Sequence, residues 1–163
     1  PPNETCNWVT LHAGKIPMIR PILILVFLIL MFGTGGATSA EEDVILIRQE
    51  GMRLASEKMT MIKFDIRASE FKQTLNYAKD LQTWSELFSN YFPAGTEASI
   101  NNGSAANENI WSNARLFDDL VIQIKDGIKS MIAATRSRDK RAQLGGFNMT
   151  KNACENCHKE FRN

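Results

Sequence analysis

The chain has 163 residues, a formal net charge of +1 and 44% hydrophobic residues. This length predicts a single domain, and residues 41–163 carry equal numbers of acidic and basic side chains. So balanced a charge argues against binding to nucleic acid or to an anionic membrane surface.

The N-terminal part has the layout of an export signal. A short basic start at residues 18–20 precedes an apolar run over residues 21–32, and small residues follow up to Ala40. This three-part pattern is typical of a cleavable signal peptide. An uncleaved membrane anchor is the alternative, but the run is short of the about 20 residues that a span needs, so no stable anchor is expected. The predicted division is a non-native or upstream extension (1–17), a signal peptide (18–40) and a mature domain (41–163).

Two helices are predicted in the first half of this domain. Each carries an apolar stripe at helical spacing, as an amphipathic helix does. Over residues 42–68 the stripe consists of Ile45, Met52, Ala55, Met59, Ile62 and Ile66. Over residues 69–92 it consists of Phe71, Leu75, Ala78, Leu81, Phe88 and Phe92.

The second half of the domain predicts a loop and two more helices. Residues 93–107 are rich in turn residues. Residues 108–136 carry a third stripe, formed by Trp111, Ala114, Phe117, Val121, Ile124, Ile128 and Met131. Residues 139–161 form the fourth helix, in which the pair Gly145-Gly146 predicts a kink or local break. No strand pattern is convincing, and four such helices predict an all-α, antiparallel up-down-up-down bundle.

The fourth helix carries the most informative motif, Cys154-Glu155-Asn156-Cys157-His158. Cys-x-x-Cys-His is the attachment site of a c-type haem. The two thiols form thioethers with the porphyrin, and the imidazole becomes an axial ligand of the iron. Residues three and four apart share one face of a helix, so all three side chains can address one flat ligand. We therefore predict one covalent haem c, attached through Cys154 and Cys157, with His158 bound to iron.

Three other uses of the motif must be weighed. A thioredoxin-like Cys-x-x-Cys belongs to a βαβ setting, which this sequence lacks. A structural zinc site takes four Cys or His ligands, whereas residues 41–163 contain only Cys154, Cys157 and His158. A disulfide is poorly accommodated between cysteines three apart on a continuous helix. Haem attachment is the favoured interpretation, with disulfide or redox chemistry as the remaining alternative.

The helical pattern with its motif at the C-terminal end resembles the class II c-type cytochromes, the cytochrome c′ family and its low-spin, methionine-ligated branch. The resemblance covers nearly all of residues 41–163. It rests on four segments: Arg48-Gln49-Glu50-Gly51-Met52, Phe92-Pro93-Ala94-Gly95-Thr96, Ile110-Trp111-Ser112 and Cys154 to Arg162. It implies a periplasmic monohaem bundle, often a homodimer, that transfers electrons or binds small gases.

The resemblance also assigns roles to three further residues. Arg48 would lie near a haem propionate, although an arginine on a stripe can also extend its charge to solvent. Met52 would face the open side of the iron, either as its sixth ligand or as a side chain that only blocks it; methionine on a stripe is otherwise core filling. Arg162 would lie beside His158, and the alternative is a solvated charge at a helix end.

The favoured function is a periplasmic electron carrier in which His158 and Met52 ligate iron and redox proteins are the partners. The alternative is a five-coordinate cytochrome c′ that binds nitric oxide or carbon monoxide, with Met52 blocking the distal face. A third hypothesis is a haem-free helical module that binds a partner protein. An enzyme is not expected, because residues 41–163 have no second histidine, no Ser/His/Asp set and no phosphate loop.

Overall fold

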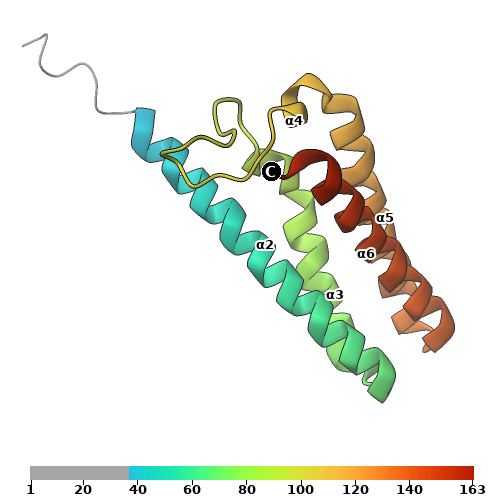
Figure 1. Ribbon diagram of the computed structural model, residues 1–163. Coiled ribbons are helices and arrows are strands. Elements are labelled where there is room, and N and C mark those ends of the chain that lie inside the picture. Colours follow the sequence, from blue (N-terminus) through green and yellow to red (C-terminus); the bar gives the residue numbers. More distant parts are fainter. Residues whose placement is uncertain (1–36) are drawn as a thin grey trace, which may run out of the picture. The chain divides into compact units, whose positions relative to one another are not determined.

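The computed structural model describes residues 37–163 (Figure 1). The predicted extension and all but the last four residues of the predicted signal peptide lie outside the described residues. The helices are α2 (Ala37–Ala68), α3 (Phe71–Glu86), the 3-10 turn η1 (Phe88–Tyr91), α4 (Asn109–Ser112), α5 (Ala114–Arg136) and α6 (Lys140–Phe161). Within this part of the chain, no helix combines the length and apolarity needed to cross a membrane.

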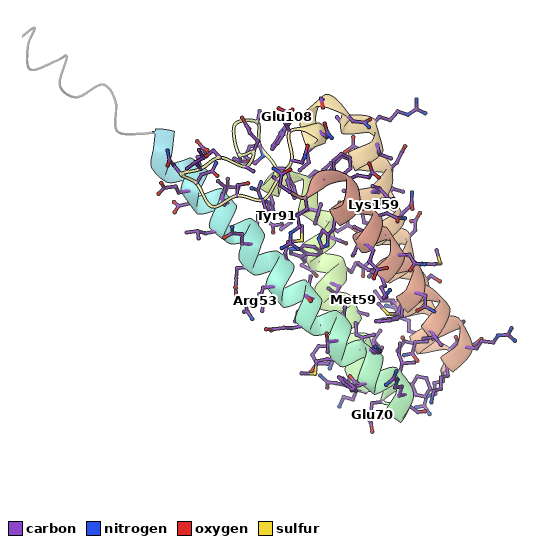
Figure 2. All side chains as sticks on the ribbon, viewed as in Figure 1. Arg53, Met59, Glu70, Tyr91, Glu108 and Lys159 are labelled. Atoms are coloured by element: carbon purple, nitrogen blue, oxygen red, sulfur yellow. The ribbon has the colours of Figure 1, made fainter. Side chains whose placement is uncertain are left out.

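The four long helices form the predicted bundle. Each packs against two others, because contacts join α2 to α3, α3 to α5, α5 to α6 and α6 to α2. A long connection, residues 92–108, joins η1 to α4 and crosses one end of the bundle (Figure 1). The turns at the other end are short and each contains a residue with positive φ, Ser69 at 63° and Arg138 at 57°. Side chains on the inner stripes fill the bundle, among them the half-buried Met59 (Figure 2).

Three helices differ from those predicted. The first begins at Ala37 rather than at residue 42. The second helix ends at Glu86 rather than at Phe92, and a 3-10 turn takes its place. Pro93 follows, and the residue before a proline is disfavoured in the helical conformation. The third predicted helix is interrupted at Asn113, whose φ of −125° and ψ of 48° separate α4 from α5. The interruption changes the helical phase, so Ala114 is exposed although the stripe placed it inward.

Helices α5 and α6 lie in close contact at two glycines. A Cβ atom on Gly146 would lie 2.5 Å from the backbone nitrogen of Met131, and one on Gly127 would lie 2.6 Å from Thr150 Oγ1. The backbones can approach this closely only because both positions lack a side chain. The expected local break at Gly145-Gly146 is wrong, since α6 continues from Lys140 to Phe161. Gly146 serves a contact between helices instead.

The buried side chains form two clusters along the bundle. The first fills the end near the short turns and includes Ile62, Leu81, Ile128 and Met131. The second lies beside the long connection. It contains the aromatic group Phe88, Phe92, Phe117 and Phe161, in which each ring contacts at least one other at centroid distances of 5.1–6.0 Å. The second cluster supports the end of the bundle at which the Cys-x-x-Cys-His motif lies.

The neighbouring glycines of α6 offer a matched test of the helix contact. Gly146→Ala should lower the free energy of unfolding by about 1–3 kcal/mol, because the added methyl group forces the backbones apart. Gly145→Ala should raise it by about 0.5–1 kcal/mol, since nothing lies within 4 Å of that position and alanine favours a helix. Thermal and denaturant unfolding of both variants measures the difference. Equal effects of the two substitutions would contradict the assigned contact.

Candidate functional site

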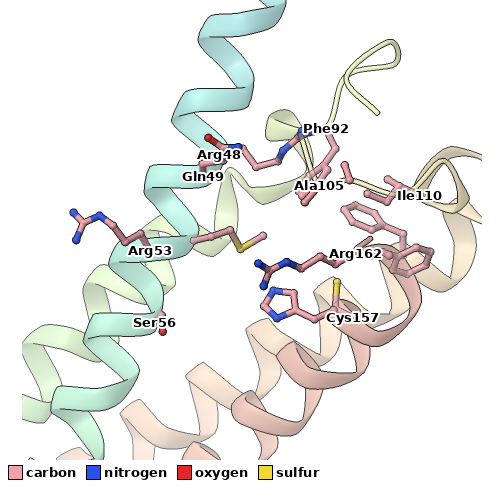
Figure 3. Close-up of a pocket in the computed structure, with 14 residues that line it drawn as sticks. Arg48, Gln49, Arg53, Ser56, Phe92, Ala105, Ile110, Cys157 and Arg162 are labelled. Atoms are coloured by element: carbon pink, nitrogen blue, oxygen red, sulfur yellow. The ribbon is translucent and has the colours of Figure 1, made fainter. Parts of the chain in front are cut away.

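A cavity of about 500 Å³ opens between α2 and the C-terminal half of α6 (Figure 3). Helix α2 contributes one wall, α6 the facing wall, and the long connection with its neighbouring aromatic side chains closes one end. Its volume lies within the range of about 300–1,000 Å³ that small-molecule sites occupy. The lining residues are Arg48, Gln49, Met52, Arg53, Ser56, Phe92, Ala105, Ala106, Ile110, Phe117, Cys157, His158, Phe161 and Arg162.

The wall formed by α6 carries most of the Cys-x-x-Cys-His motif. Cys157 is buried with its sulfur in the cavity (Figure 3), and the exposed His158 also lines the cavity. Cys154 lies one turn earlier, half-buried against the first core cluster, and does not line the cavity. Both cysteines are free thiols. The structure therefore brings Cys157 and His158 together on one wall, with Cys154 next to them on the same helix.

Burial changes the acid–base properties of this wall. Desolvation raises the pKa of the Cys154 thiol to about 11, with the neighbouring Cys157 and Glu155 adding to the effect, and it raises the pKa of Cys157 to about 11. Reactive redox cysteines have lowered values instead. Desolvation, followed by the positive charge of Arg162, lowers the pKa of His158. At neutral pH the motif therefore presents two protonated thiols and an uncharged imidazole that can donate a lone pair.

The opposite wall is formed by α2 and carries Met52. This side chain is half-buried, lines the cavity and packs against the second core cluster. It lies four residues after Arg48, so the two share one face of the helix. The cavity therefore has an imidazole on one wall and a thioether on the other.

Arg48 is almost fully buried, with 6% of its surface exposed. Its Nη1 donates to Tyr91 O at 3.1 Å and to Thr96 Oγ1 at 3.0 Å, and its Nη2 donates to Thr96 O at 2.9 Å and to Ser104 Oγ at 2.7 Å. Its guanidinium also lies 4.8 Å from the centroid of the Phe92 ring. All four acceptors are uncharged, and burial lowers the pKa of the guanidinium. The alternative interpretation, in which Arg48 extends its charge to solvent, is wrong.

Arg162 lines the cavity on the same side as His158, and its guanidinium points into the space between α6 and α2 (Figure 3). It is not helical, because α6 ends at Phe161 and Arg162 takes an extended conformation. Its backbone pairs with Ala106 in an isolated antiparallel bridge. Thr96 and Ser104 hold Arg48 in place, and this role was not predicted. Polar residues in a loop give no signal of a partner 48 or 56 positions away.

The residues at this cavity fit a haem c. A buried cation without an anionic partner is costly, and in residues 37–163 no acceptor of Arg48 is a carboxylate. The propionates of a haem would supply that missing anion. Aromatic and aliphatic side chains line the space between Met52 and His158, as a porphyrin ring requires. A zinc site would need four ligands, and within the described residues no three His, Cys, Asp or Glu side chains converge.

The chain is similar to a known protein family in sequence and to solved structures in fold. Residues 43–162 match the family model described as Cytochrome C′. The fold is similar to that of cytochrome c′ from Rubrivivax gelatinosus, with a TM-score of 0.68, 21% identity, and coverage of 76% of this chain and 97% of that one. No curated protein sequence is significantly similar to this chain.

Two further solved structures are similar in fold. One is the nitrosyl complex of a variant of cytochrome c prime from Alcaligenes xylosoxidans, with a TM-score of 0.68, 24% identity, and coverage of 76% of this chain and 97% of that one. The other is a cytochrome c′ described as having ligand-controlled dimer dissociation, with a TM-score of 0.69, 16% identity, and coverage of 75% and 95%.

The raised pKa values predict slow alkylation of Cys154 and Cys157 in the folded chain before haem is attached. A pKa of about 11 instead of about 8.5 lowers the thiolate fraction at neutral pH roughly 10²-fold. The rate should rise with pH toward that pKa. Mass analysis of peptides after iodoacetamide treatment measures it, with the same chain in denaturant as control. Equal rates in the folded and unfolded chain would contradict the burial of these thiols.

Proposed function

This chain belongs to the cytochrome c′ family, and we propose that it carries one covalent haem c whose distal face binds a small gas, nitric oxide or carbon monoxide. The members of this family are non-enzymatic haem proteins. The observation that carries the proposal is the cavity that places His158 and Met52 on facing walls. A haem bound there supplies an iron atom that coordinates a diatomic gas. The nitrosyl complex of the Alcaligenes xylosoxidans protein, which has the same fold, supports this choice.

The proximal wall would hold the haem through three side chains. Cys154 and Cys157 are the thiols for the two thioether bonds, and His158 is the iron ligand. The lowered pKa of His158 keeps the imidazole uncharged, so its lone pair is free at neutral pH. Arg162 stands on the same wall and repels a proton on His158. In this assignment Arg162 keeps the ligand neutral rather than binding the haem directly.

The distal wall would control access to the sixth position. Met52 packs against the second core cluster, as Trp84 and Phe92 also do. A side chain held in this way blocks the distal face until a small ligand displaces it. Arg48 would meet a propionate at the edge of the haem, where a carboxylate would balance its buried charge. These two residues of α2 would therefore orient the haem and limit what reaches its iron.

An electron carrier is the second candidate, because Met52 is a thioether on the wall facing His158. Ligation by Met52 would fill the sixth position, exclude gases and raise the reduction potential. Redox proteins would then be the partners. The two functions differ in one bond, the one between the Met52 sulfur and iron, and they predict different spectra.

We also propose export to the periplasm and self-association. Residues 18–40 have the composition of a signal peptide, and attachment of haem c takes place outside the bacterial cytoplasm. A homodimer is supported by three exposed apolar residues seven positions apart on α2: Ile47, Leu54 and Met61, with 55%, 40% and 50% of their surfaces exposed. The protein of similar fold with ligand-controlled dimer dissociation is consistent with this assignment.

Covalent haem is the first property to test. The denatured wild-type protein, produced with haem-attachment machinery, should have the mass of the polypeptide plus one haem. Replacing both Cys154 and Cys157 by alanine should remove that added mass, whereas Lys159→Ala, next to the motif, should retain it. A wild-type chain of unmodified mass would refute the haem function and favour a haem-free module.

Met52→Leu separates the two candidate functions. For the gas-binding protein, the oxidised wild type should be high-spin, the reduced form should bind carbon monoxide rapidly, and the substitution should leave the spin state unchanged. For a Met52-ligated carrier, the wild type should be low-spin with a sulfur-to-iron charge-transfer band, which Met52→Leu abolishes. Absorption spectra in both redox states, with and without carbon monoxide, decide between them. A low-spin spectrum of the oxidised wild-type protein would reject gas binding at this iron.

The dimer is tested by introducing a negative charge among the exposed apolar residues of α2. Leu54→Glu should convert a dimer into a monomer in sedimentation velocity, because a carboxylate would be buried in the interface. Ile122→Glu is the control, since Ile122 is equally apolar and 54% exposed but lies on α5. A monomeric wild type, or dissociation by both substitutions, would argue against an interface on α2.

A further inference from the structure

The connection between η1 and α4, residues 92–108, touches both walls of the cavity and is hereafter called the connecting loop. At the α2 wall it is held by Arg48, which donates hydrogen bonds to Thr96 Oγ1, Thr96 O and Ser104 Oγ. Thr96 is 2% exposed and Ser104 is 9% exposed. Because the donor is a cation and the contacts are shielded from water, these bonds are stronger than ordinary ones.

Both hydroxyl groups donate and accept hydrogen bonds within this network. Ser104 Oγ accepts from Arg48 and from the backbone nitrogen of Ala106 at 3.1 Å, and it donates to Thr96 O at 2.8 Å. Thr96 Oγ1 accepts from Arg48 and donates to Pro93 O at 2.8 Å. Each hydroxyl thus links the α2 side chain to the backbone of the connecting loop. Removal of either one would leave a buried guanidinium N–H without its partner.

At the other wall the same loop is joined to the end of α6. Ala106 and Arg162 form a backbone bridge, Asn107 N donates to Phe161 O at 2.9 Å, and Asn163 N donates to Ala105 O at 3.0 Å. Arg162 N in turn donates to His158 O at 3.2 Å. Arg48 is therefore linked through Ser104 to the loop segment 105–107, and this segment is hydrogen-bonded to residues 161 and 163 at the end of α6.

The two attached segments lie close in sequence to the two residues that face each other across the cavity. Arg48 precedes Met52 by four positions on α2, and Arg162 follows His158 by four positions. Figure 3 shows Arg48 reaching from α2 toward Phe92 of the loop. The hydrogen bonds that join the connecting loop to Arg48 and to the end of α6 are together called the tie. They limit how far the α2 wall can move from the α6 wall.

We propose that Thr96 and Ser104 are positioning residues that set the separation of Met52 from His158 and so determine how readily a sixth ligand reaches the haem iron. This inference rests on the proposed haem function. Neither hydroxyl lines the cavity, so both act through Arg48 and through the loop backbone. Groups that orient the ligands of a metal, without binding it, commonly control its ligand binding in this way.

The test uses the full haem-loaded chain and two substitutions that remove one hydroxyl each, Thr96→Val and Ser104→Ala. Thr96→Ser and Ser104→Thr keep the hydroxyl and serve as rescue variants. The matched controls are Thr83→Val on α3 and Ser130→Ala on α5, where both side chains are exposed. Hydrogen exchange at the amides of Ala106 and Asn107 reports the tie itself. Carbon monoxide association with the reduced protein and the spin state of the oxidised protein report ligand access.

Loss of a hydroxyl should speed exchange at Ala106 and Asn107 about tenfold or more, since a buried bond to a charged group is lost. Because the α2 wall is then less constrained, carbon monoxide association should change by at least about threefold. The controls should stay within about twofold, and the rescue variants should return toward wild type.

Faster exchange with unchanged carbon monoxide association and spin state would overturn the inference, because the tie would then be structural only. Unchanged exchange would overturn it as well, because no tie would exist. A wild-type chain without covalent haem would overturn both the inference and the proposed function. The mass of the denatured protein separates that outcome from a failure of the inference alone.

Discussion

The close contact between α5 and α6 is the constraint on which the rest of this structure depends. At Gly146 the α6 backbone lies against that of Met131, so α6 cannot rotate without a clash. The face of α6 that packs on α5 is thereby fixed, and the face that carries Cys157 and His158 is turned toward α2. A motif that binds a flat ligand needs such a fixed helix, because the two thiols and the imidazole must keep their common orientation.

A second constraint acts on the opposite wall, where a buried cation has only neutral partners. Arg48 is expensive to desolvate, and its four hydrogen bonds, three to the connecting loop and one to Tyr91 of η1, offset part of that cost. The loop in turn is held in one conformation by the guanidinium. A haem carboxylate would complete the balance of charge. The same side chain would therefore contribute to the stability of the loop, to the orientation of the haem and to the position of Met52.

The two candidate functions share nearly all of this architecture. Both need the two thiols of α6, an uncharged imidazole and an apolar space between α2 and α6. They differ in whether the Met52 sulfur comes close enough to iron to bind it, which is a matter of small displacements of one helix wall. A rigid link between the walls has consequences here, because metal–ligand bonds form only over a narrow range of distances. Under our proposal, gas binding and electron transfer would thus be alternative uses of one site rather than of two different sites.

Much of this protein could be predicted from local patterns of residues. The apolar stripe from Ile45 to Ile66 predicted α2 and its buried face, and the spacing of Cys154, Cys157 and His158 predicted one shared helical surface. These features depend on residues within a few turns of each other, so the regular geometry of a helix is enough to derive them. The helical break at Asn113 and the close contact at Gly146 could not be derived, because each is decided by packing between helices.

The features of the candidate site also fall into those that the sequence predicts and those that only the folded structure decides. The sequence by itself determined the chemical groups: two thiols, one imidazole, a methionine and an arginine on an apolar stripe. Only the tertiary structure decided that Arg48 is buried with Thr96 and Ser104, and that the loop carrying them also binds the end of α6. The partners of these hydrogen bonds are 48 and 56 residues apart in the chain. Hydroxyl groups in a polar loop look alike in sequence, and the folded bundle selects the two that meet the buried charge.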